Sequence, residues 1–302
     1  MNKNNGKKIK MSREDKIFHI IGYTVYSILL IIFAYPFYHL LISTISDNDL
    51  VTMNQITLFP KGIHFENYLS VFKLDRMRTA ALVSLAKTLL GTVCNVLVVS
   101  YVAYCFTKEN MWQRKLAYRF VVATMYFGTG LIPVYMNIKM LGLMNSFWVY
   151  VIPHCFTTYN MVLVKTSMEA LPPSLEESAE IDGAGYLVRF FKIVLPLSKP
   201  ILATVALFTA VSQWNNIFDT KLYIVNHELY SLQFLLHEYY QRIQSIQDTI
   251  EGIGGGSEMT QIVSATSIRL TMTAVTVIPI MCVYPFIQKY YMKGMMLGAV
   301  KG

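Results

Sequence analysis

Long apolar stretches without acidic residues constrain this chain more than any other feature of its sequence. A membrane-spanning helix needs about 20 apolar residues to cross a hydrocarbon core of about 30 Å. Only 15% of the 302 residues are charged, whereas soluble domains carry about 25%. We therefore predict an all-α membrane protein with six transmembrane helices, at residues 17–43, 80–106, 117–138, 144–168, 201–218 and 270–288.

The distribution of positive charge predicts how the chain is oriented. With a cytoplasmic N-terminus, 16 lysine and arginine residues fall on the inside and 8 on the outside, while Lys87 and Arg119 fall within spans. Cytoplasmic loops of membrane proteins carry such an excess. We therefore expect both termini in the cytoplasm. The bias also explains the net charge of +8 without a nucleic acid partner.

The spans and loops divide the chain into regions. The expected regions are a basic cytoplasmic arm at 1–16, the first transmembrane helix at 17–43, an external loop at 44–79, and a transmembrane core at 80–302 that includes a cytoplasmic loop at 169–200 and an external loop at 219–269.

Both external loops contain amphipathic segments. Residues 65–72 predict a helix lying at the membrane surface. In the second loop, apolar residues recur in steps of four and three, which is one stripe of an amphipathic helix. The stripe consists of Leu232, Leu236, Tyr239, Ile243, Ile246 and Ile250. It packs either on the same chain or on a partner subunit.

The four cysteines predict no special chemistry. Cys94, Cys105, Cys155 and Cys282 all lie inside apolar stretches, and none has the spacing of metal ligands or of a loop disulfide. We expect them to act as small buried hydrophobic residues.

The cytoplasmic loop predicts two short helices joined at a glycine corner. Ser174 is expected to cap the first helix, with Glu177 completing a capping box. Gly183 and Gly185 are expected to end it, and the second helix is expected to stop before Pro196. Small residues at this corner let another protein surface approach closely.

The same loop carries the spacing E-A-A-x3-G-x9-I-x-L-P, with serine in place of the first alanine. Asp182, the pair Trp214 and Asn215, and the ending 284–302 add to the pattern. Over residues 67–302 the chain resembles the permeases of bacterial ABC importers, in particular the polysaccharide-permease subgroup of the maltose-type, carbohydrate-uptake family. The residues expected to couple the chain to an ATPase are Glu177, Ser178, Ala179, Asp182, Gly183, Ile193, Leu195 and Pro196.

The resemblance also implies a fold, partners and a location. The fold is a core of five helices from residue 80 onwards, plus one N-terminal helix. The chain forms half of a carbohydrate path in the bacterial cell membrane, in a heterodimer with a second, homologous permease. Two ATP-binding cassette subunits hold ATP and Mg²⁺, so this chain binds no cofactor and is not itself an enzyme. An extracellular solute-binding protein delivers the sugar and meets the loop 219–269.

Two other classes of function fit the sequence less well. A secondary transporter or channel for a small polar solute commonly places carboxylates in its spans, and the six expected spans contain no Asp or Glu. A membrane enzyme would need a catalytic constellation. The S-x-x-K pattern at Ser84–Lys87 lacks the companion motifs of penicillin-binding enzymes. No Gly-rich phosphate loop of the G-x-x-x-x-G-K-[ST] type is present.

Aromatic and amide residues in the spans are candidates for the substrate path. Rings stack on the C–H faces of sugars and amides bond hydroxyl groups. The candidates are Lys87, Tyr126, Asn137, Tyr159, Asn160, Trp214 and Asn215. Two alternatives remain open, because tyrosine and tryptophan also form belts at membrane interfaces and a lysine near a span end can extend to the membrane surface.

Overall fold

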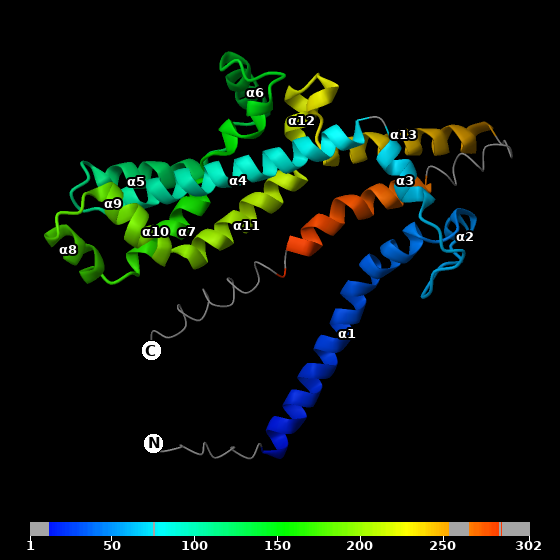
Figure 1. Cartoon of the computed structure of the whole chain (residues 1–302), viewed down its shortest axis with the longest axis horizontal. Coiled ribbons are helices and arrows are strands. Elements are labelled where there is room, and N and C mark those ends of the chain that lie inside the picture. The colour runs from blue at the N-terminus through cyan, green and yellow to red at the C-terminus, as the bar shows by residue number, and fades with distance from the viewer. Residues whose placement is uncertain (1–11, 75, 254–265, 284, 286–302) are drawn as a thin grey trace. The chain divides into compact units, whose positions relative to one another are not determined.

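The computed structural model describes residues 12–74, 76–253, 266–283 and 285, and these form helices and loops without a strand. The all-α expectation is confirmed. The chain divides into two compact units, one of residues 1–69 and 255–274 and the other of residues 70–254 and 275–302. Figure 1 shows the helices with their labels.

The first unit contains a long apolar helix, α1 (Arg13–Thr44), which begins four residues before the expected span and so extends into the expected arm. Ser12 and Asp15 form a capping box at its start, which satisfies backbone groups that the first turn leaves unpaired. Its side chains are exposed as far as residue 41, apart from a few that are half-buried. Such a surface is compatible with lipid or with another apolar protein surface.

The loop that follows α1 folds back on the end of that helix. Tyr35 and His39 bond the backbone oxygens of Thr57 and Ile56, at 3.2 and 3.0 Å. The short helix α2 (Asn48–Thr52) contributes Val51 to a small apolar cluster with Ile42. The expected amphipathic segment forms α3 (Glu66–Lys73).

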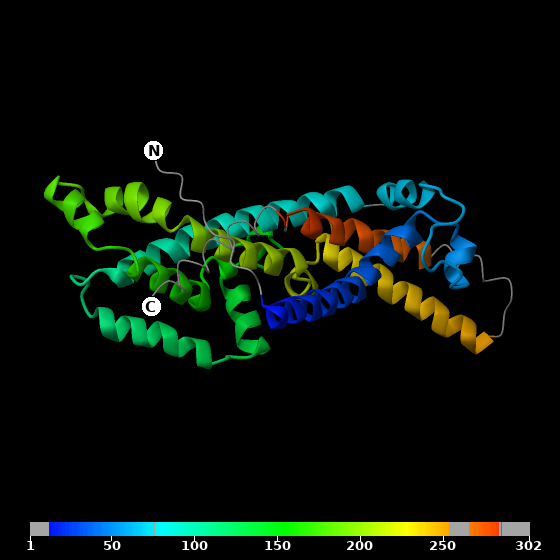
Figure 2. The same cartoon turned by 90° about the horizontal axis from the view of Figure 1, so that it is seen from below.

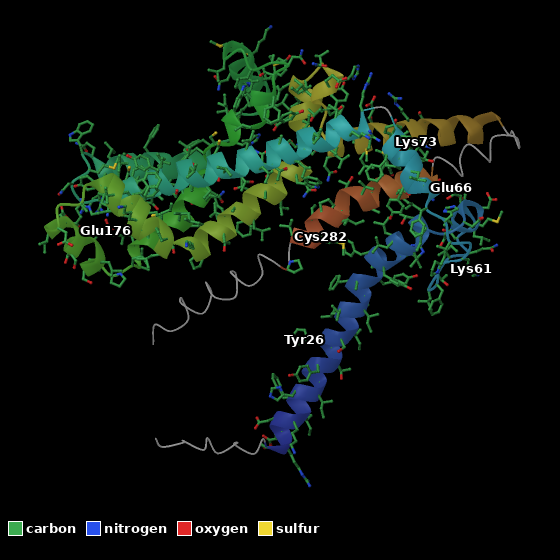
Figure 3. All side chains as sticks on the ribbon, in the orientation of Figure 1. Tyr26, Lys61, Glu66, Lys73, Glu176 and Cys282 are labelled. Atoms are coloured by element: carbon green, nitrogen blue, oxygen red, sulfur yellow. The ribbon has the colours of Figure 1, made fainter. Side chains whose placement is uncertain are left out.

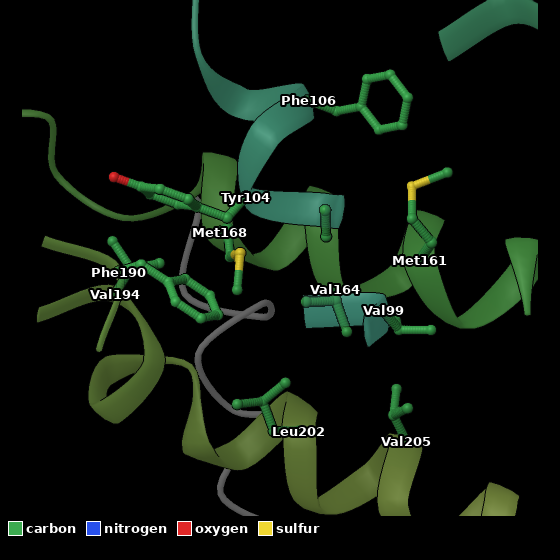
Figure 4. Close-up of a cluster of buried hydrophobic side chains, with 11 residues drawn as sticks. Val99, Tyr104, Phe106, Met161, Val164, Met168, Phe190, Val194, Leu202 and Val205 are labelled. Carbon is green, nitrogen blue, oxygen red and sulfur yellow. The ribbon is translucent and has the colours of Figure 1, made fainter. Parts of the chain in front are cut away.

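The second unit is built around α4 (Met77–Thr107), which matches the expected span 80–106. It packs against α7 (Thr158–Glu169) and α11 (Lys199–Asn215), and Figure 2 shows α11 running alongside it. The C-terminal half of α4 forms an apolar core with these helices and with residues 190–194, drawn in Figure 4. The core consists of Val99, Ala103, Tyr104, Phe106, Met161, Val164, Met168, Phe190, Val194, Leu202 and Val205.

The expected span 117–138 is wrong as a single helix. The structure has α5 (Arg114–Ala123), a 3-10 turn at Thr124–Tyr126, and α6 (Leu131–Met140), with the two parts at 119°. Gly130 adopts a φ of +80° between them, a backbone conformation that glycine reaches without steric penalty. Hydropathy averages over such a break and therefore does not detect it.

The expected span 144–168 is also broken. It consists of two 3-10 helices, η2 (Phe147–Tyr150) and η3 (Ile152–His154), followed by α7 at a bend of 46°. Pro153 lies in η3 and cannot donate a backbone hydrogen bond.

The last two expected spans are changed at their ends. The span 201–218 ends early, because α11 stops at Asn215 and the separate helix α12 (Phe218–Tyr223) follows. The final helix covers Thr266–Val283, and the rest of the expected span 270–288 falls almost entirely outside the described residues. Among the described residues, three helices are long and apolar enough to span a membrane, or up to six if each bent pair is one span.

The amphipathic helix expected in the external loop is present as α13 (Leu232–Ile253). Leu232 and Ile243 of the expected stripe are buried, as is Leu235 beside it. The first turn packs on α4, where the amide of Leu232 donates to the Ser84 hydroxyl at 2.7 Å. The start of the helix thus packs on its own chain; the side chains of Ile246 and Ile250 lie outside the described residues.

Candidate functional site

The exposed loop between α7 and α11 folds as a short helix, a sharp corner and a second helical segment. The first helix is α8 (Ser174–Ile181). The second segment consists of α9 (Tyr186–Arg189), a π-helical turn η4 (Phe190–Val194) and α10 (Leu195–Leu197). Figure 3 marks Glu176 at this end of the unit.

The capping box expected at Ser174 is wrong. The helix begins one residue earlier than expected: Pro173 is the N-cap residue and Ser174 is already helical. No side chain caps the N-terminus of the helix. The backbone oxygen of Ser174 instead accepts from the Ser178 hydroxyl at 2.8 Å. Glu176 and Glu177 remain in the first turn, where their charge interacts favourably with the helix dipole.

The corner after α8 is the one that the glycine pattern predicts. Gly183 has a φ of +78°, and its amide donates to the oxygen of Glu180 at 2.9 Å. The amide of Ala184 donates to the oxygen of Ala179, also at 2.9 Å. This pair of bonds is a Schellman motif, which ends a helix at a residue in the left-handed conformation. The first helix therefore stops where expected.

The second segment was expected to stop before Pro196, and this is wrong: it remains helical to Leu197. The π-helical turn directly precedes this proline. A widened turn accommodates a residue that breaks the regular hydrogen-bond ladder, so the helical segment continues through the proline. α11 then follows at 80°.

The expected coupling residues fall into an exposed and a half-buried set. Glu177, Ser178, Asp182, Gly183 and Pro196 are exposed, and Ile181 beside them is 87% exposed. Ala179, Ile193 and Leu195 are half-buried. A large apolar side chain this exposed at the tip of a loop is typical of a surface that another protein covers.

The residues expected along a substrate path do not form one group. Lys87, Asn160 and Trp214 are buried inside the unit, whereas Tyr126, Asn137, Tyr159 and Asn215 are exposed. The Trp214 indole donates to the backbone oxygen of Thr276 at 3.1 Å. The adjacent Asn215 amide bonds within α11 and to Gln233. The side chains of Trp214 and Asn215 therefore have different partners in this structure.

Lys87 neither lines an exposed path nor extends to the surface, which were the two interpretations of its place in the sequence. Its ammonium group donates to the backbone oxygen of Asn216 at 2.8 Å and lies 5.1 Å from the ring centroid of Tyr150. Asn216 follows the last residue of α11, so its carbonyl has no helical partner. Lys87 thus satisfies the backbone at a helix break, which is the condition for irregular backbone within a membrane.

Three more residues lie on the same face of α4: Ser84 and Asn95, which also form hydrogen bonds to distant segments, and Gly91, where Gln213 approaches closely. Together with Lys87 we call them the polar face of α4. Asn95 donates to the oxygen of His154 and to Thr157, at 2.8 and 3.1 Å, in the break before α7. Its own oxygen accepts from Asn160 and Thr209, at 3.2 and 3.1 Å. At Gly91, an added Cβ would come within 2.9 Å of the Gln213 amide.

Only some of these contacts could be predicted from the sequence. Asn95 is an amide in an apolar stretch, which marks it as buried and paired. Glu176 bonds to Tyr104 of α4 and to Lys108, which follows the last residue of α4. These partners lie about 70 residues earlier in the chain, and no local pattern connects them to Glu176. His154 and Asp219, at 2.7 Å, pair across 65 residues in the same way.

Comparisons with known proteins agree with this fold. Residues 96–296 match the family described as "binding-protein-dependent transport system inner membrane component". The polygalacturonan/rhamnogalacturonan transport system permease protein YtcP of Bacillus subtilis (strain 168) is 33% identical over 96% of this chain and 100% of its own length. Protein LplC of the same strain is 32% identical over 88% of this chain and 89% of its own length.

A solved structure extends the likeness to three dimensions. It is a crystal structure of a bacterial ABC transporter involved in the import of the acidic polysaccharide alginate, with a TM-score of 0.82 and 28% identity, covering 94% of this chain and 99% of the other. The family match spans the corner, both flanking helical segments and α4 from residue 96 onwards. This chain is a membrane permease that belongs to the family of inner membrane components of binding-protein-dependent transport systems.

Proposed function

We propose that this permease forms half of the path for an oligosaccharide in an ABC importer. The exposed corner at Gly183, with Glu177 and Ile181 on the outer surface of α8, carries the proposal. A surface of this kind suits docking into the groove of a separate ATPase. We infer that Glu177, Ser178, Ala179, Asp182, Gly183, Ile193, Leu195 and Pro196 make or support that contact.

This chain contains one coupling loop, so we propose that it contacts one ATPase and needs further subunits to complete the importer. A second, homologous permease completes the path as a heterodimer, and two ATP-binding cassette subunits hold ATP and Mg²⁺. An extracellular binding protein delivers the sugar to the outer side. The two permease likenesses above name polygalacturonan and alginate, both polymers of acidic sugars, so an oligogalacturonide is the first sugar to test.

The path itself is proposed for the exposed candidates. The exposed candidates in the single chain are Tyr126, Asn137, Tyr159 and Asn215. Their rings can stack on the C–H faces of a sugar, and their amides can bond its hydroxyl groups. The buried candidates Lys87, Asn160 and Trp214 position the helices behind that surface.

Uptake in cells tests the substrate class. Deleting the gene for this chain is expected to lower uptake of radiolabelled trigalacturonate by more than an order of magnitude, and expression from a plasmid restores it. Maltotriose serves as the neutral comparison sugar. If uptake of neither sugar depends on the chain, the oligosaccharide proposal is contradicted.

The same cells separate an ABC importer from a secondary transporter. Uptake through an ABC importer stops when arsenate depletes ATP, and it survives a protonophore as long as ATP remains. A secondary carrier driven by an ion gradient responds in the opposite way, so protonophore-sensitive uptake in ATP-replete cells would support the alternative.

We also propose that both termini and the loop 169–200 are cytoplasmic, whereas the loop 219–269 is external. In a variant without native cysteines, Glu228→Cys is expected to react with an impermeant thiol reagent in intact cells. Glu109→Cys is expected to react only after lysis. Both positions are exposed in the structure, so a difference in labelling reports on the side of the membrane. The reverse pattern would overturn this topology.

A further inference from the structure

Three carboxylates and one isoleucine of α8 divide into two sets by the face of the helix that they occupy. Glu176 and Glu180 lie four residues apart and therefore share one face of the helix. Glu177 and Ile181 share the next face and are exposed. Among the residues that the structure describes, only the first set forms ion pairs: Glu176 with Lys108, and Glu180 with Arg189.

Glu176 connects α8 to the cytoplasmic end of α4. One of its oxygens accepts from the Tyr104 hydroxyl at 3.0 Å and pairs with the Lys108 ammonium group. Lys108 also lies 4.1 Å from the ring centroid of Tyr104. Only 20% of the Lys108 side chain and 25% of the Glu176 side chain are exposed, so solvent and salt screen this pair less than a surface ion pair.

Glu180 connects α8 to the segment on the other side of the corner. It pairs with the Arg189 guanidinium at 2.7 Å, and the Arg189 side chain is 6% exposed. The guanidinium carbon lies 4.4 Å from the Tyr186 ring centroid. The next residue, Phe190, packs on Tyr104 with ring centroids 5.2 Å apart. The Glu180–Arg189 pair thus connects α8, through the neighbouring Phe190, to Tyr104 near the end of α4.

We propose that Glu176 with Lys108 and Tyr104, and Glu180 with Arg189, are positioning residues that make α8 a rigid extension of α4. The proposal rests on the coupling function proposed above and deepens it. A force on the outer surface of α8 then moves α4, whose polar face holds the helix breaks at the other end of the unit. Without the two contacts, the glycine corner would absorb the movement.

Hydrogen exchange in the full-length permease in nanodiscs tests the main contact without a sugar or a partner. Lys108→Glu and Glu176→Lys each place like charges opposite one another. Backbone amides of residues 175–184 are expected to exchange about tenfold faster in either variant, because local opening sets their rate. The double variant Lys108→Glu/Glu176→Lys restores the pair with reversed polarity and is expected to return exchange to within about twofold of the wild type.

Glu109→Lys is the matched control, because Glu109 is exposed beside Lys108 and its change reverses a charge in the same turn. It is expected to leave exchange in α8 unaltered. Unchanged exchange in both single variants, or a double variant no better than the singles, would overturn the proposal. So would faster exchange that spreads through α7 and α11 with a lower melting temperature, since that would be a general loss of stability.

Uptake in cells gives the functional readout. The single variants are expected to lower trigalacturonate uptake about tenfold at equal membrane amounts, and the double variant is expected to recover it. Wild-type uptake that proves independent of ATP would contradict the proposed function, while the exchange comparison would still decide whether Glu176 holds α8 to α4. Normal uptake in single variants whose α8 exchanges rapidly would overturn the positioning role.

Discussion

Replacing Gly183 with aspartate is expected to lower uptake by at least an order of magnitude while leaving the permease folded and inserted. Gly183 has a φ of +78°, and a Cβ added there meets no atom within 4 Å. A non-glycine residue in this conformation costs about 1–2 kcal/mol, too little to unfold the unit. The new carboxylate would instead project from the corner that is proposed to dock on the ATPase. Uptake per inserted molecule and the amount of copurified ATPase measure the effect.

Gly142→Asp is the control for backbone strain. Gly142 has a φ of +70° and equally open surroundings, but it lies between α6 and η2, outside the proposed docking surface. Its variant should have a similar small loss of stability and near-normal uptake. If Gly183→Asp transports normally, or if both variants lose uptake equally, the corner has no special part in coupling.

Replacing Asn95 with leucine is expected to destabilise the second unit by about 1–3 kcal/mol. The change removes the bonds to the oxygen of His154 and to Thr157, and it leaves Asn160 and Thr209 without the oxygen they share. Hydrogen bonds between membrane helices average about 0.6 kcal/mol each, so several lost together account for this range. Unfolding of the purified protein in SDS, followed by tryptophan fluorescence, measures the change.

Thr92→Val provides a matched control one turn away on α4. The Thr92 hydroxyl is buried and has no hydrogen-bond partner in the structure, so an isosteric apolar replacement should be neutral or slightly stabilising. Equal stability of the Asn95 and Thr92 variants would mean that the Asn95 bonds contribute nothing to the fold.

Hydropathy was sufficient to locate the apolar segments but not to show their breaks. The long helices α1 and α4 follow the apolar runs closely, although α1 contains Pro36 and α4 contains Gly91. An isolated Pro or Gly in a long apolar run therefore did not break either helix. The run 117–138 contains Gly128, Gly130 and Pro133, and the structure breaks there. Those residues were visible in the sequence, but a window average of hydropathy has no term for backbone geometry.

The candidate site was predictable where its geometry is local. The end of α8 depends on Gly183 and its immediate neighbours, so the spacing located it. The start of α8 depends on a choice between adjacent residues, Pro173 and Ser174, that differ little as first residues of a helix. Contacts between distant residues had no local signal, which is why the partners of Glu176 and the burial of Lys87 came only from the structure.

The polar face of α4 has a consequence for how this protein is made. Ser84, Lys87 and Asn95 all bond to groups that appear later in the chain, with partners 148, 129 and between 59 and 114 residues further on. Synthesis runs from the N-terminus, so α4 leaves the ribosome long before α11 and α13 exist. During that interval its lysine and asparagine must be solvated by water or by the insertion machinery. The polar side chains of α4 therefore gain their final partners only after the residues around Asn216 have been synthesised.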